Sequence, residues 1–461
     1  MIPQYEPRPN QEWALRGRSV FAKDGVRPAT VYIRGEKIVA VLGPNELPAG
    51  VPLVEAGDCW VLPGLVETHA HINEPGRTDW EGFASATRAA AAGGITTLVD
   101  MPLNSSPVTT TAEALRSKRD AAAGQIMVDC GFHAGIVPGN AGEVQSLIEA
   151  GVCGFKAFLC HSGIDDFPNA TEADLRAVMP TIAKAGLPLL VHCEIVAPLP
   201  AKIEEAFAAA PRSYAAYLAT RPASWEIAAI RLMINLCREY RCPVHIVHLA
   251  AAEEARPLLA AARNEGLPLT VETCPHYLYF AAEEIPDADP RYKCAPPIRE
   301  KRTRTILHDM VLSGEIDTLG SDHSPAPPAL KHLDTGDLRR AWGGIASLQL
   351  LLPIAWTALG SLERVVTALT RKPAELAGLS ETKGAIAAGL DADLVLFNPN
   401  AEFVVTAAML QHKHKATPYL GRTLRGVVES TWLRGRNIFH RGEFPTLPPG
   451  RLLSRAMRDS S

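Results

Sequence analysis

Five side chains that can bind metal ions stand at the ends of predicted β-strands. His69 and His71 are two residues apart near the end of an apolar run, so their imidazoles project from the same face of a strand. That spacing can chelate one metal ion, although two hydrogen-bonded histidines would explain it equally well. His192, His248 and Asp322 end three further runs of this kind. Because barrel enzymes carry their chemistry at strand ends, we interpret the five as one metal site.

A lysine stands in the apolar run VCGFKAFLC, residues 152–160. Burying the ammonium group of Lys156 is unfavourable and lowers its pKa toward a neutral, nucleophilic amine. One interpretation pairs Lys156 with an acidic group across a barrel. The other, which we favour once the five other ligands are considered, is that CO₂ carboxylates the amine. The resulting carbamate is an anion whose two oxygens can bridge two metal ions.

Strand parity separates two of these ligands from neighbouring histidines. His248 follows His245 by three residues, and an odd separation on a strand sends the side chains to opposite faces. We assign His248 to the barrel mouth because it is nearer the strand end, and we expect His245 to face a helix. By the same reasoning Asp322 is the expected ligand, whereas His323 begins the next loop and could support a ligand.

The elements that must position these residues alternate along the chain. From about residue 61 to 372, short runs rich in β-branched residues alternate with Ala-rich amphipathic stretches, which is typical of parallel βα units. The predicted strands are 61–71, 95–102, 127–137, 152–159, 187–193, 243–249, 268–274 and 316–322. The predicted helices are 81–93, 111–123, 141–150, 171–185, 222–240, 251–265, 300–313 and 344–358. Eight repeats favour a closed α/β fold, the (β/α)8 or TIM barrel, over an open doubly wound sheet. An open sheet would usually carry a Gly-rich phosphate-binding turn, which this sequence lacks.

The two ends of the chain predict a second, smaller domain. Both flanks contain strand-like pieces separated by turns, with little helical periodicity. A hairpin from either end alone would bury too little apolar surface to be stable, so we expect the ends to pair. We predict a small β-sandwich-like domain from residues 1–60 and 384–461, interrupted by the barrel at 61–383.

The Pro-rich segment 323–344 is long for a loop after strand eight and is expected to shape the active site.

Composition limits the possible partners. The 461 residues carry 46 Lys and Arg against 50 Asp and Glu, a net charge of −4, which does not predict a nucleic acid or an anionic membrane as partner. The nine cysteines form no C-x-x-C pair and several lie in apolar runs, which indicates reduced core residues of a cytoplasmic protein. No signal peptide and no apolar stretch of about 18 residues is found, so no membrane span is predicted. We expect a small-molecule ligand.

The ordered ligand set resembles that of the binuclear amidohydrolase superfamily, in its cyclic amidohydrolase branch. The segment GAIAAGLDADLVLFNP (384–399) is similar to the C-terminal β domain of that superfamily, so the resemblance covers nearly the whole chain. Six segments look most like the allantoinase family: HINEPGRTDWEGF (71–83), GGITTLVDMPLNSSPVTT (93–110), GFKAFLCHSGIDDF (154–167), ETCPHYL (272–278), KCAPPIR (293–299) and SDHSPAPP (321–328).

The resemblance implies two divalent metal ions, zinc by default, bridged by N6-carboxylated Lys156 and a hydroxide. One ion would also take His69, His71 and Asp322, and the other His192 and His248. The cations would acidify the bridging water, and Asp322 would be the catalytic residue that passes its proton to the leaving ring nitrogen. The implied reaction opens a cyclic ureide, (S)-allantoin to allantoate, in purine catabolism.

Two positions distinguish this chain from related cyclic amidohydrolases. Dihydroorotase-like enzymes carry an Arg two residues after the H-x-H pair to bind the substrate carboxylate. This chain has Asn73 there, which disfavours a carboxylate-bearing ring. Hydantoinases and dihydropyrimidinases carry a Tyr five residues after the carboxylated lysine, where this chain has His161, either an oxyanion donor or a surface loop residue. Cys294, Ser324 and Gly343 are further expected substrate contacts, each alternatively a turn or packing residue.

Two other functions stay open at this point. A hydantoinase- or dihydropyrimidinase-type cyclic amidase would use the same metal site. A non-catalytic scaffold related to the dihydropyrimidinases would have lost metal ligands, whereas all six expected ligands are present here. The resemblance also implies a homo-oligomer, with a tetramer favoured.

Overall fold

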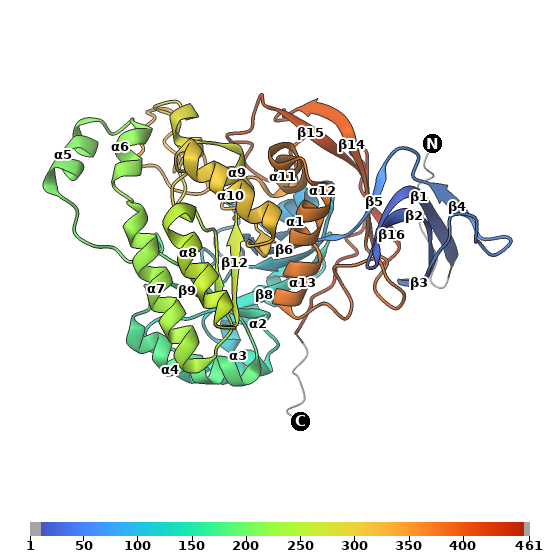
Figure 1. Cartoon of the computed structure of the whole chain (residues 1–461), viewed down its shortest axis with the longest axis horizontal. Coiled ribbons are helices and arrows are strands. Elements are labelled where there is room, and N and C mark those ends of the chain that lie inside the picture. Colours follow the sequence, from blue (N-terminus) through green and yellow to red (C-terminus); the bar gives the residue numbers. More distant parts are fainter. Residues whose placement is uncertain (1–10, 456–461) are drawn as a thin grey trace.

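The computed structural model describes residues 11–455 and places them in two parts (Figure 1). A barrel of parallel strands and surrounding helices makes up most of the molecule, and a mixed sheet from both ends of the chain lies beside it. The predicted fold class, a (β/α)8 barrel with a small β domain, is confirmed.

The barrel strands come one from each of the eight predicted runs. They are β6 (Leu65–Ala70), β7 (Ile95–Asp100), β8 (Asp129–Gly135), β9 (Gly154–Phe158), β10 (Leu189–His192), β11 (Val244–Ile246), β12 (Leu269–Thr273) and β13 (Thr318–Leu319). Their order in the sheet follows the chain, and neighbouring strands are parallel. The ring closes beyond the last strand, where Ala70 bridges His323 and the His71 amide donates to the His323 carbonyl at 2.8 Å.

Helices cover the outside of the barrel, as expected when both faces of a parallel sheet must be buried. The predicted helical stretches overlap α1 (Phe83–Ala92), α2 (Ala112–Ala122), α3 (Val144–Glu149), α4 (Glu172–Ala185), α7 (Ala223–Tyr240), α8 (Ala252–Asn264), α10 (Lys301–Ser313) and α11 (Leu351–Leu359). Local signals set their ends: α4 begins with a capping box of Thr171 and Asp174 and ends at Gly186, whose φ of 64° suits glycine. Within residues 11–455, none of the helices is both long and apolar enough to cross a membrane.

Five short helices were not predicted: α5 (Ala201–Ala209), α6 (Tyr214–Ala219), α9 (Pro275–Tyr279), α12 (Leu362–Leu369) and α13 (Arg371–Ala377). Each has five to nine residues, too few for an apolar stripe to stand out in the sequence. Helices α5 and α6 lie between β10 and α7, at the end of the molecule farthest from the mixed sheet (Figure 1).

The mixed sheet joins the two ends of the chain. Its strands are β1 (Glu12–Ala22), β2 (Gly25–Arg34), β3 (Lys37–Leu42), β4 (Leu53–Glu55), β5 (Trp60–Pro63), β14 (Leu394–Val404), β15 (Thr423–Leu433) and β16 (Arg436–His440). The ends meet where β5 pairs antiparallel with β14. Trp13 and Trp432 are fully buried in a core separate from that of the barrel, with ring centroids 5.9 Å apart. The predicted strand 61–71 is therefore two strands, of which only β6 belongs to the barrel.

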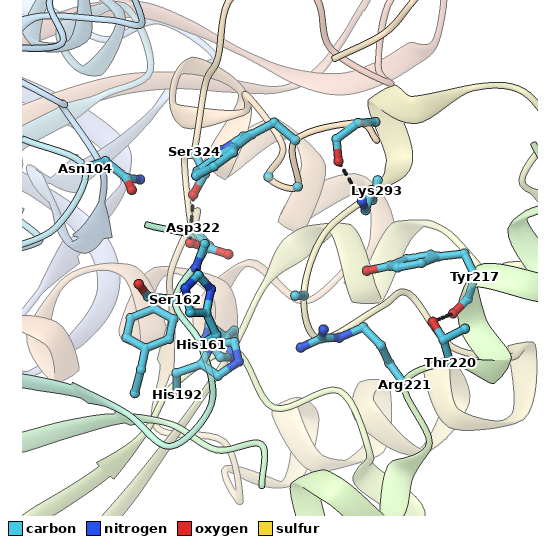
Figure 2. Close-up of a pocket in the computed structure, with 18 of the residues that line it drawn as sticks. Asn104, His161, Ser162, His192, Tyr217, Thr220, Arg221, Lys293, Asp322 and Ser324 are labelled. Carbon is cyan, nitrogen blue, oxygen red and sulfur yellow. Dashed lines mark hydrogen bonds between the residues drawn. The ribbon is translucent and has the colours of Figure 1, made fainter. Parts of the chain in front are cut away.

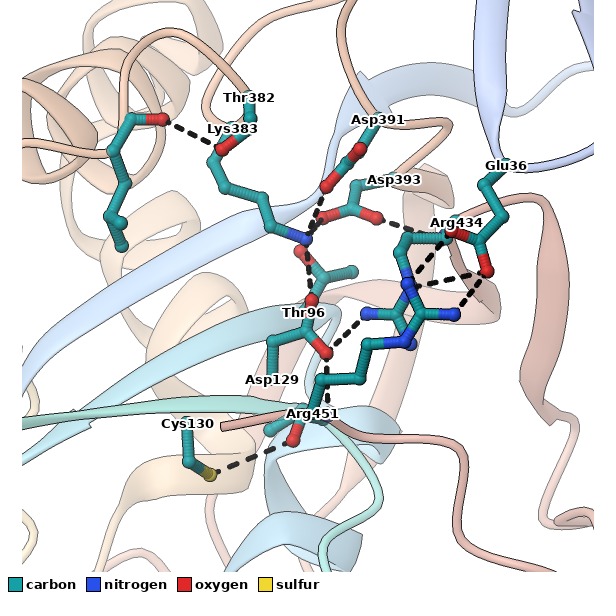
Figure 3. Close-up of polar contacts among 12 residues, drawn as sticks. Glu36, Thr96, Asp129, Cys130, Thr382, Lys383, Asp391, Asp393, Arg434 and Arg451 are labelled. Atoms are coloured by element: carbon teal, nitrogen blue, oxygen red, sulfur yellow. Dashed lines mark hydrogen bonds and ion pairs between the residues drawn. The ribbon is translucent and has the colours of Figure 1, made fainter. Parts of the chain in front are cut away.

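A buried cluster of charges ties this sheet to the barrel (Figure 3). The Nζ of Lys383 lies 2.7 Å from Asp129, at the start of β8, and 2.9 Å from both Asp391 and Asp393, which precede β14. Arg434, which follows β15, forms a second ion pair with Asp129. Because Asp129 begins its strand, the cluster lies at the end of the barrel opposite the predicted active site.

Candidate active site

A cavity of about 580 Å³ opens at the carboxyl ends of the barrel strands (Figure 2). Its walls come from segments that follow β6, β9, β10, β11 and β13, and from the excursion that contains α5 and α6. Five of the six predicted metal ligands line it, all except Lys156, as do several aromatic and cationic side chains. The barrel topology thus brings residues separated by some 250 positions in the sequence, from His69 to Asp322, into one space.

His69, His71 and Asp322 form a buried cluster whose ligand atoms all lie within 4.8 Å of one another. The Asp322 Oδ1 is 3.3 Å from the His69 Nε2 and 3.4 Å from the His71 Nε2. The Nδ1 of His69 donates to Glu272 at 2.5 Å, which fixes the ring and turns Nε2 toward Asp322. Although burial alone raises the pKa of Asp322, the surrounding histidines lower it well below its usual value.

His192 and His248 stand beside this cluster. Their ring centroids are 4.6 Å apart, and the His248 ring is 5.4 Å from that of His69. His248 does not reach the site by strand alternation, because β11 ends at Ile246. Instead its backbone adopts a left-handed φ of 40°, and Asp322 does the same with a φ of 43°. Such conformations are uncommon for residues other than glycine and are concentrated at functional sites.

The prediction that His245 faces a helix is wrong. Its Nδ1 bonds with the Thr270 hydroxyl at 2.7 Å, and the Thr318 hydroxyl lies 3.4 Å from its Nε2. These partners lie on the next two barrel strands, so His245 points into the barrel below the site. Strand alternation does not apply to His248, because that residue lies in the segment after β11.

Lys156 is fully buried on β9, and its Nζ has no hydrogen-bond partner within residues 11–455. Burial lowers the pKa of Lys156 to about 8, although Asp322 and Glu272 oppose the shift. The amine is thus chemically suited to react with CO₂ in its neutral form. The Nδ1 atoms of His71 and His248 also lack partners among the described residues. Buried polar atoms without partners beside imidazole and carboxylate donors fit the binding of divalent metal ions.

Comparison with known proteins agrees with this geometry. A model of the amidohydrolase family matches residues 60–438. The chain belongs to this family. An allantoinase of Streptomyces avermitilis is 49% identical over 449 residues, which cover 96% of this chain and 99% of that protein. An allantoinase of Arabidopsis thaliana is 43% identical over 455 residues, which cover 94% of this chain and 89% of that protein. Among solved structures, L-hydantoinase (dihydropyrimidinase) from Arthrobacter aurescens has a TM-score of 0.90 at 30% identity and covers 96% of this chain and 99% of its own.

The residues predicted to contact substrate in this amidohydrolase fall into two groups. His161, Ser324 and Gly343 line the cavity, and the Ser324 hydroxyl donates to Asp322 at 3.1 Å. The side chain of His161 is largely exposed, and its Nε2 lies 3.2 Å from the Asp165 Oδ1. Asn73 and Cys294 are buried and are not among the residues that line the cavity. The Asn73 amide donates to the Pro325 carbonyl at 3.4 Å, and the Cys294 thiol to the Pro296 carbonyl at 3.3 Å.

Sequence reasoning missed a pair of charged residues at the cavity, of which Arg221 lines it and Glu194 lies behind it. Glu194, two residues after His192, is fully buried and accepts from the His192 Nε2 at 2.8 Å. Arg221, which precedes α7, holds the same carboxylate through its Nε and Nη2. Burial alone raises the pKa of Glu194, but Arg221 and His192 lower it to about 2. An acidic residue closely following His192 was the available signal for Glu194, whereas Arg221 comes from a loop with no recognisable spacing.

Cys160, His192 and Glu194 also lie close enough together to hold a metal ion, with ligand atoms within 4.8 Å. We favour a different role for Glu194, because the guanidinium of Arg221 already neutralises it. A second cation on the same carboxylate would be repelled by that guanidinium. Glu194 therefore orients His192, as carboxylates commonly orient metal-binding imidazoles.

Two lysines, the half-buried Lys293 and the buried Lys331, hold the segment after β13 over the cavity. The Lys293 Nζ donates to the Ala341 carbonyl at 2.6 Å, and the Lys331 Nζ donates to the Gly344 carbonyl. Trp342, between these two carbonyls, lines the cavity. Burial lowers the pKa of Lys331 to about 7. The positive charge of Lys293 lowers this pKa further, whereas Cys294 raises it. The long segment 323–344 thus contributes to the cavity, in agreement with the expectation from its length.

Proposed function

We propose that this amidohydrolase is an allantoinase, which hydrolyses (S)-allantoin to allantoate. One observation carries the proposal: the buried cluster of His69, His71 and Asp322 lies beside an unpartnered lysine, in a chain 49% identical to an allantoinase over nearly its whole length. The cavity at this cluster has room for a small cyclic molecule, since ligand cavities commonly begin at about 300 Å³.

The proposal includes two divalent cations, zinc by default, and a carboxylated Lys156. His69, His71 and Asp322 would hold one ion, His192 and His248 the other, and the Lys156 carbamate both. When bound, the cations would supply Lewis-acid chemistry that acidifies water and polarises the ring carbonyl. The support for this arrangement is the chemistry of the donors and the partnerless Nζ of Lys156.

The residues of the chain would then move one proton. Asp322 accepts it from the attacking water as the new C–O bond forms at the ring carbonyl carbon. The ring C–N bond breaks, and Asp322 returns the proton to the departing nitrogen, which is otherwise a poor leaving group. The low pKa of Asp322 keeps it ionised before the reaction, and the Ser324 hydroxyl holds its Oδ1 in place. The acid released at the carbonyl carbon ionises, so the product is an anion.

A side-by-side assay of four rings tests this function. We expect the purified protein to hydrolyse allantoin with a higher kcat/KM than hydantoin, dihydrouracil or dihydroorotate. Preference for hydantoin or dihydrouracil would instead identify a hydantoinase-type amidase, an alternative that the structural likeness to L-hydantoinase keeps relevant. Preference for dihydroorotate would refute the argument from Asn73.

Metal analysis separates an enzyme from a scaffold. After growth with zinc and bicarbonate, we expect about two divalent ions per chain, as the binuclear site requires. No bound metal together with no hydrolysis of any ring would support the scaffold alternative. A tetrameric assembly and a cytoplasmic location are further parts of the proposal, to be measured by light scattering and by cell fractionation.

A further inference from the structure

Arg221 presents a hydrogen-bond donor to the cavity. Its Nε and Nη2 are occupied by the two oxygens of Glu194, whereas its Nη1 makes no hydrogen bond within residues 11–455. The side chain keeps 22% of its surface exposed, while Glu194 has none. Figure 2 shows the guanidinium extending from the wall of Tyr217 and Thr220 toward the middle of the cavity. The open edge of Arg221 thus faces the space that a substrate would fill.

The charge of this guanidinium is already compensated. Glu194 is buried and pairs with Arg221 through two parallel contacts, so the pair has no net charge as a unit. A donor of this kind suits a neutral oxygen better than a carboxylate, because an anion would also approach the buried charge of Glu194. The carbonyl of a urea group is such a neutral oxygen.

The position of Arg221 selects which part of the substrate it can reach. The reacting carbonyl must lie beside Asp322 and the imidazoles of His69 and His71. Arg221 stands apart from them, separated by His192 and Glu194. Its guanidinium carbon lies 5.9 Å from the centre of the Trp225 ring, which gives this part of the cavity a flat wall. A substituent on the ring, rather than the ring amide itself, would therefore meet Arg221.

We propose that Arg221 is a specificity-determining residue that binds the ureido substituent of the substrate through its carbonyl oxygen. This inference rests on the proposed function, because it assumes that the reacting ring is held at the metal site. It predicts that Arg221 distinguishes allantoin, which carries a ureido group, from hydantoin, which has the same ring without one.

The test compares allantoin and hydantoin, with dihydroorotate as a third ring, in three variants. Arg221→Lys keeps a cation beside Glu194 but removes the free edge of the guanidinium. The double variant Arg221→Gln with Glu194→Gln removes both charges together. As a matched control, Arg256→Lys alters another two-pronged pair, with Glu315, whose residues are not among those that line the cavity. Metal content is measured for each protein, since Glu194 also contacts His192.

We expect Arg221→Lys to bind normal amounts of metal and to lose about 10- to 100-fold in kcat/KM for allantoin, the range for a lost charge-assisted hydrogen bond. For hydantoin we expect Arg221→Lys to change kcat/KM by less than about 3-fold. In the double variant the loss of Glu194 lowers both rates through His192, and the ratio of kcat/KM for allantoin to that for hydantoin falls by the same 10- to 100-fold. Arg256→Lys is expected to resemble wild type on both rings.

Two results would overturn the inference. Equal losses on allantoin and hydantoin would mean that Arg221 only supports Glu194 and His192. A loss confined to dihydroorotate would mean that Arg221 binds a carboxylate. The wild-type measurement distinguishes failure of the proposed function from failure of the role of Arg221. If wild type does not hydrolyse allantoin, the proposed function is refuted. If the Arg221 variants keep the wild-type preference for allantoin over hydantoin, only the role of Arg221 is refuted.

Discussion

Replacing Lys383 with Met tests the charge cluster that joins the mixed sheet to the barrel. The side chain of Lys383 is 1% exposed, and its Nζ contacts the carboxylates of Asp129, Asp391 and Asp393. Met retains the apolar stem of the side chain and removes the charge. Asp129 keeps its ion pair with Arg434, and Asp391 keeps one with Lys37 at 2.7 Å, but Asp393 loses its only cationic partner among the described residues.

The structure sets the expected size of the effect. Removing one partner of a buried ion pair costs about 3–5 kcal/mol, and we expect the lower half of that range because two of the three carboxylates keep another cation. For 461 residues, an unfolding entropy of about 2 cal/mol/K per residue amounts to roughly 1 kcal/mol/K. If the chain unfolds in one transition, Tm therefore falls by about 3–4 °C.

Thermal unfolding followed by circular dichroism measures this shift. Lys372→Met is the matched control, since among residues 11–455 Lys372 makes only a partly exposed helical pair with Glu375, and we expect a shift below about 1 °C. The kcat/KM of folded Lys383→Met is expected to equal that of wild type because the cluster lies at the opposite end of the barrel. A Tm equal to that of the control, or an increase, would refute the reasoning.

Three other perturbations address the site and its covering segment. Lys156→Ala is expected to abolish hydrolysis, with partial recovery in short carboxylic acids that replace the carbamate; full activity without them would exclude a bridging role. Asp322→Asn is expected to retain most metal by elemental analysis but lose turnover, and an unchanged kcat would remove Asp322 as the proton carrier. Burial lowers the pKa of Lys331 from 10.5 to about 7, so between these values the unfolded chain binds more protons and the folded protein gains stability as pH rises. This gain is at most about 1.4 kcal/mol of unfolding free energy per pH unit, and Lys331→Met is expected to remove it. Tm measured from about pH 7 to about pH 9 checks this expectation, and the same change of Tm with pH in wild type and variant would contradict it.

The barrel could be predicted because its physical requirements repeat along the sequence. Each strand is buried on both faces and each long helix carries an apolar stripe, so eight alternating runs can be recognised. Lys156 also indicates the site from the sequence, because a lone ammonium group is unusual in such an apolar run. The split of 61–71 into β5 and β6 could not be recognised, because both halves are apolar and only the turn at Gly64 separates them.

Contacts made by loops were much harder to predict. His248 and Asp322 reach the site through left-handed backbone, which strand alternation does not describe. Arg221 and Glu194 meet across 27 residues, and the sequence between them shows no regular spacing. Asn73 in the sequence disfavours a carboxylate substrate, yet the cavity contains cationic side chains from other segments: Arg221, Lys293, Arg339 and Arg340. Charges that distant segments bring to the cavity cannot be inferred from the residue at position 73 alone.

The antiparallel pairing of β5 with β14 has a consequence for biosynthesis. Trp60 leaves the ribosome several hundred residues before Leu394, the first residue of its partner strand, which at about 5–20 residues per second means on the order of tens of seconds. During that interval the amino-terminal strands have an open edge, and exposed edges invite pairing with other chains. A chaperone that covers this edge during translation would therefore raise the yield of folded protein, whereas a chain that stops before residue 394 would keep that edge open permanently.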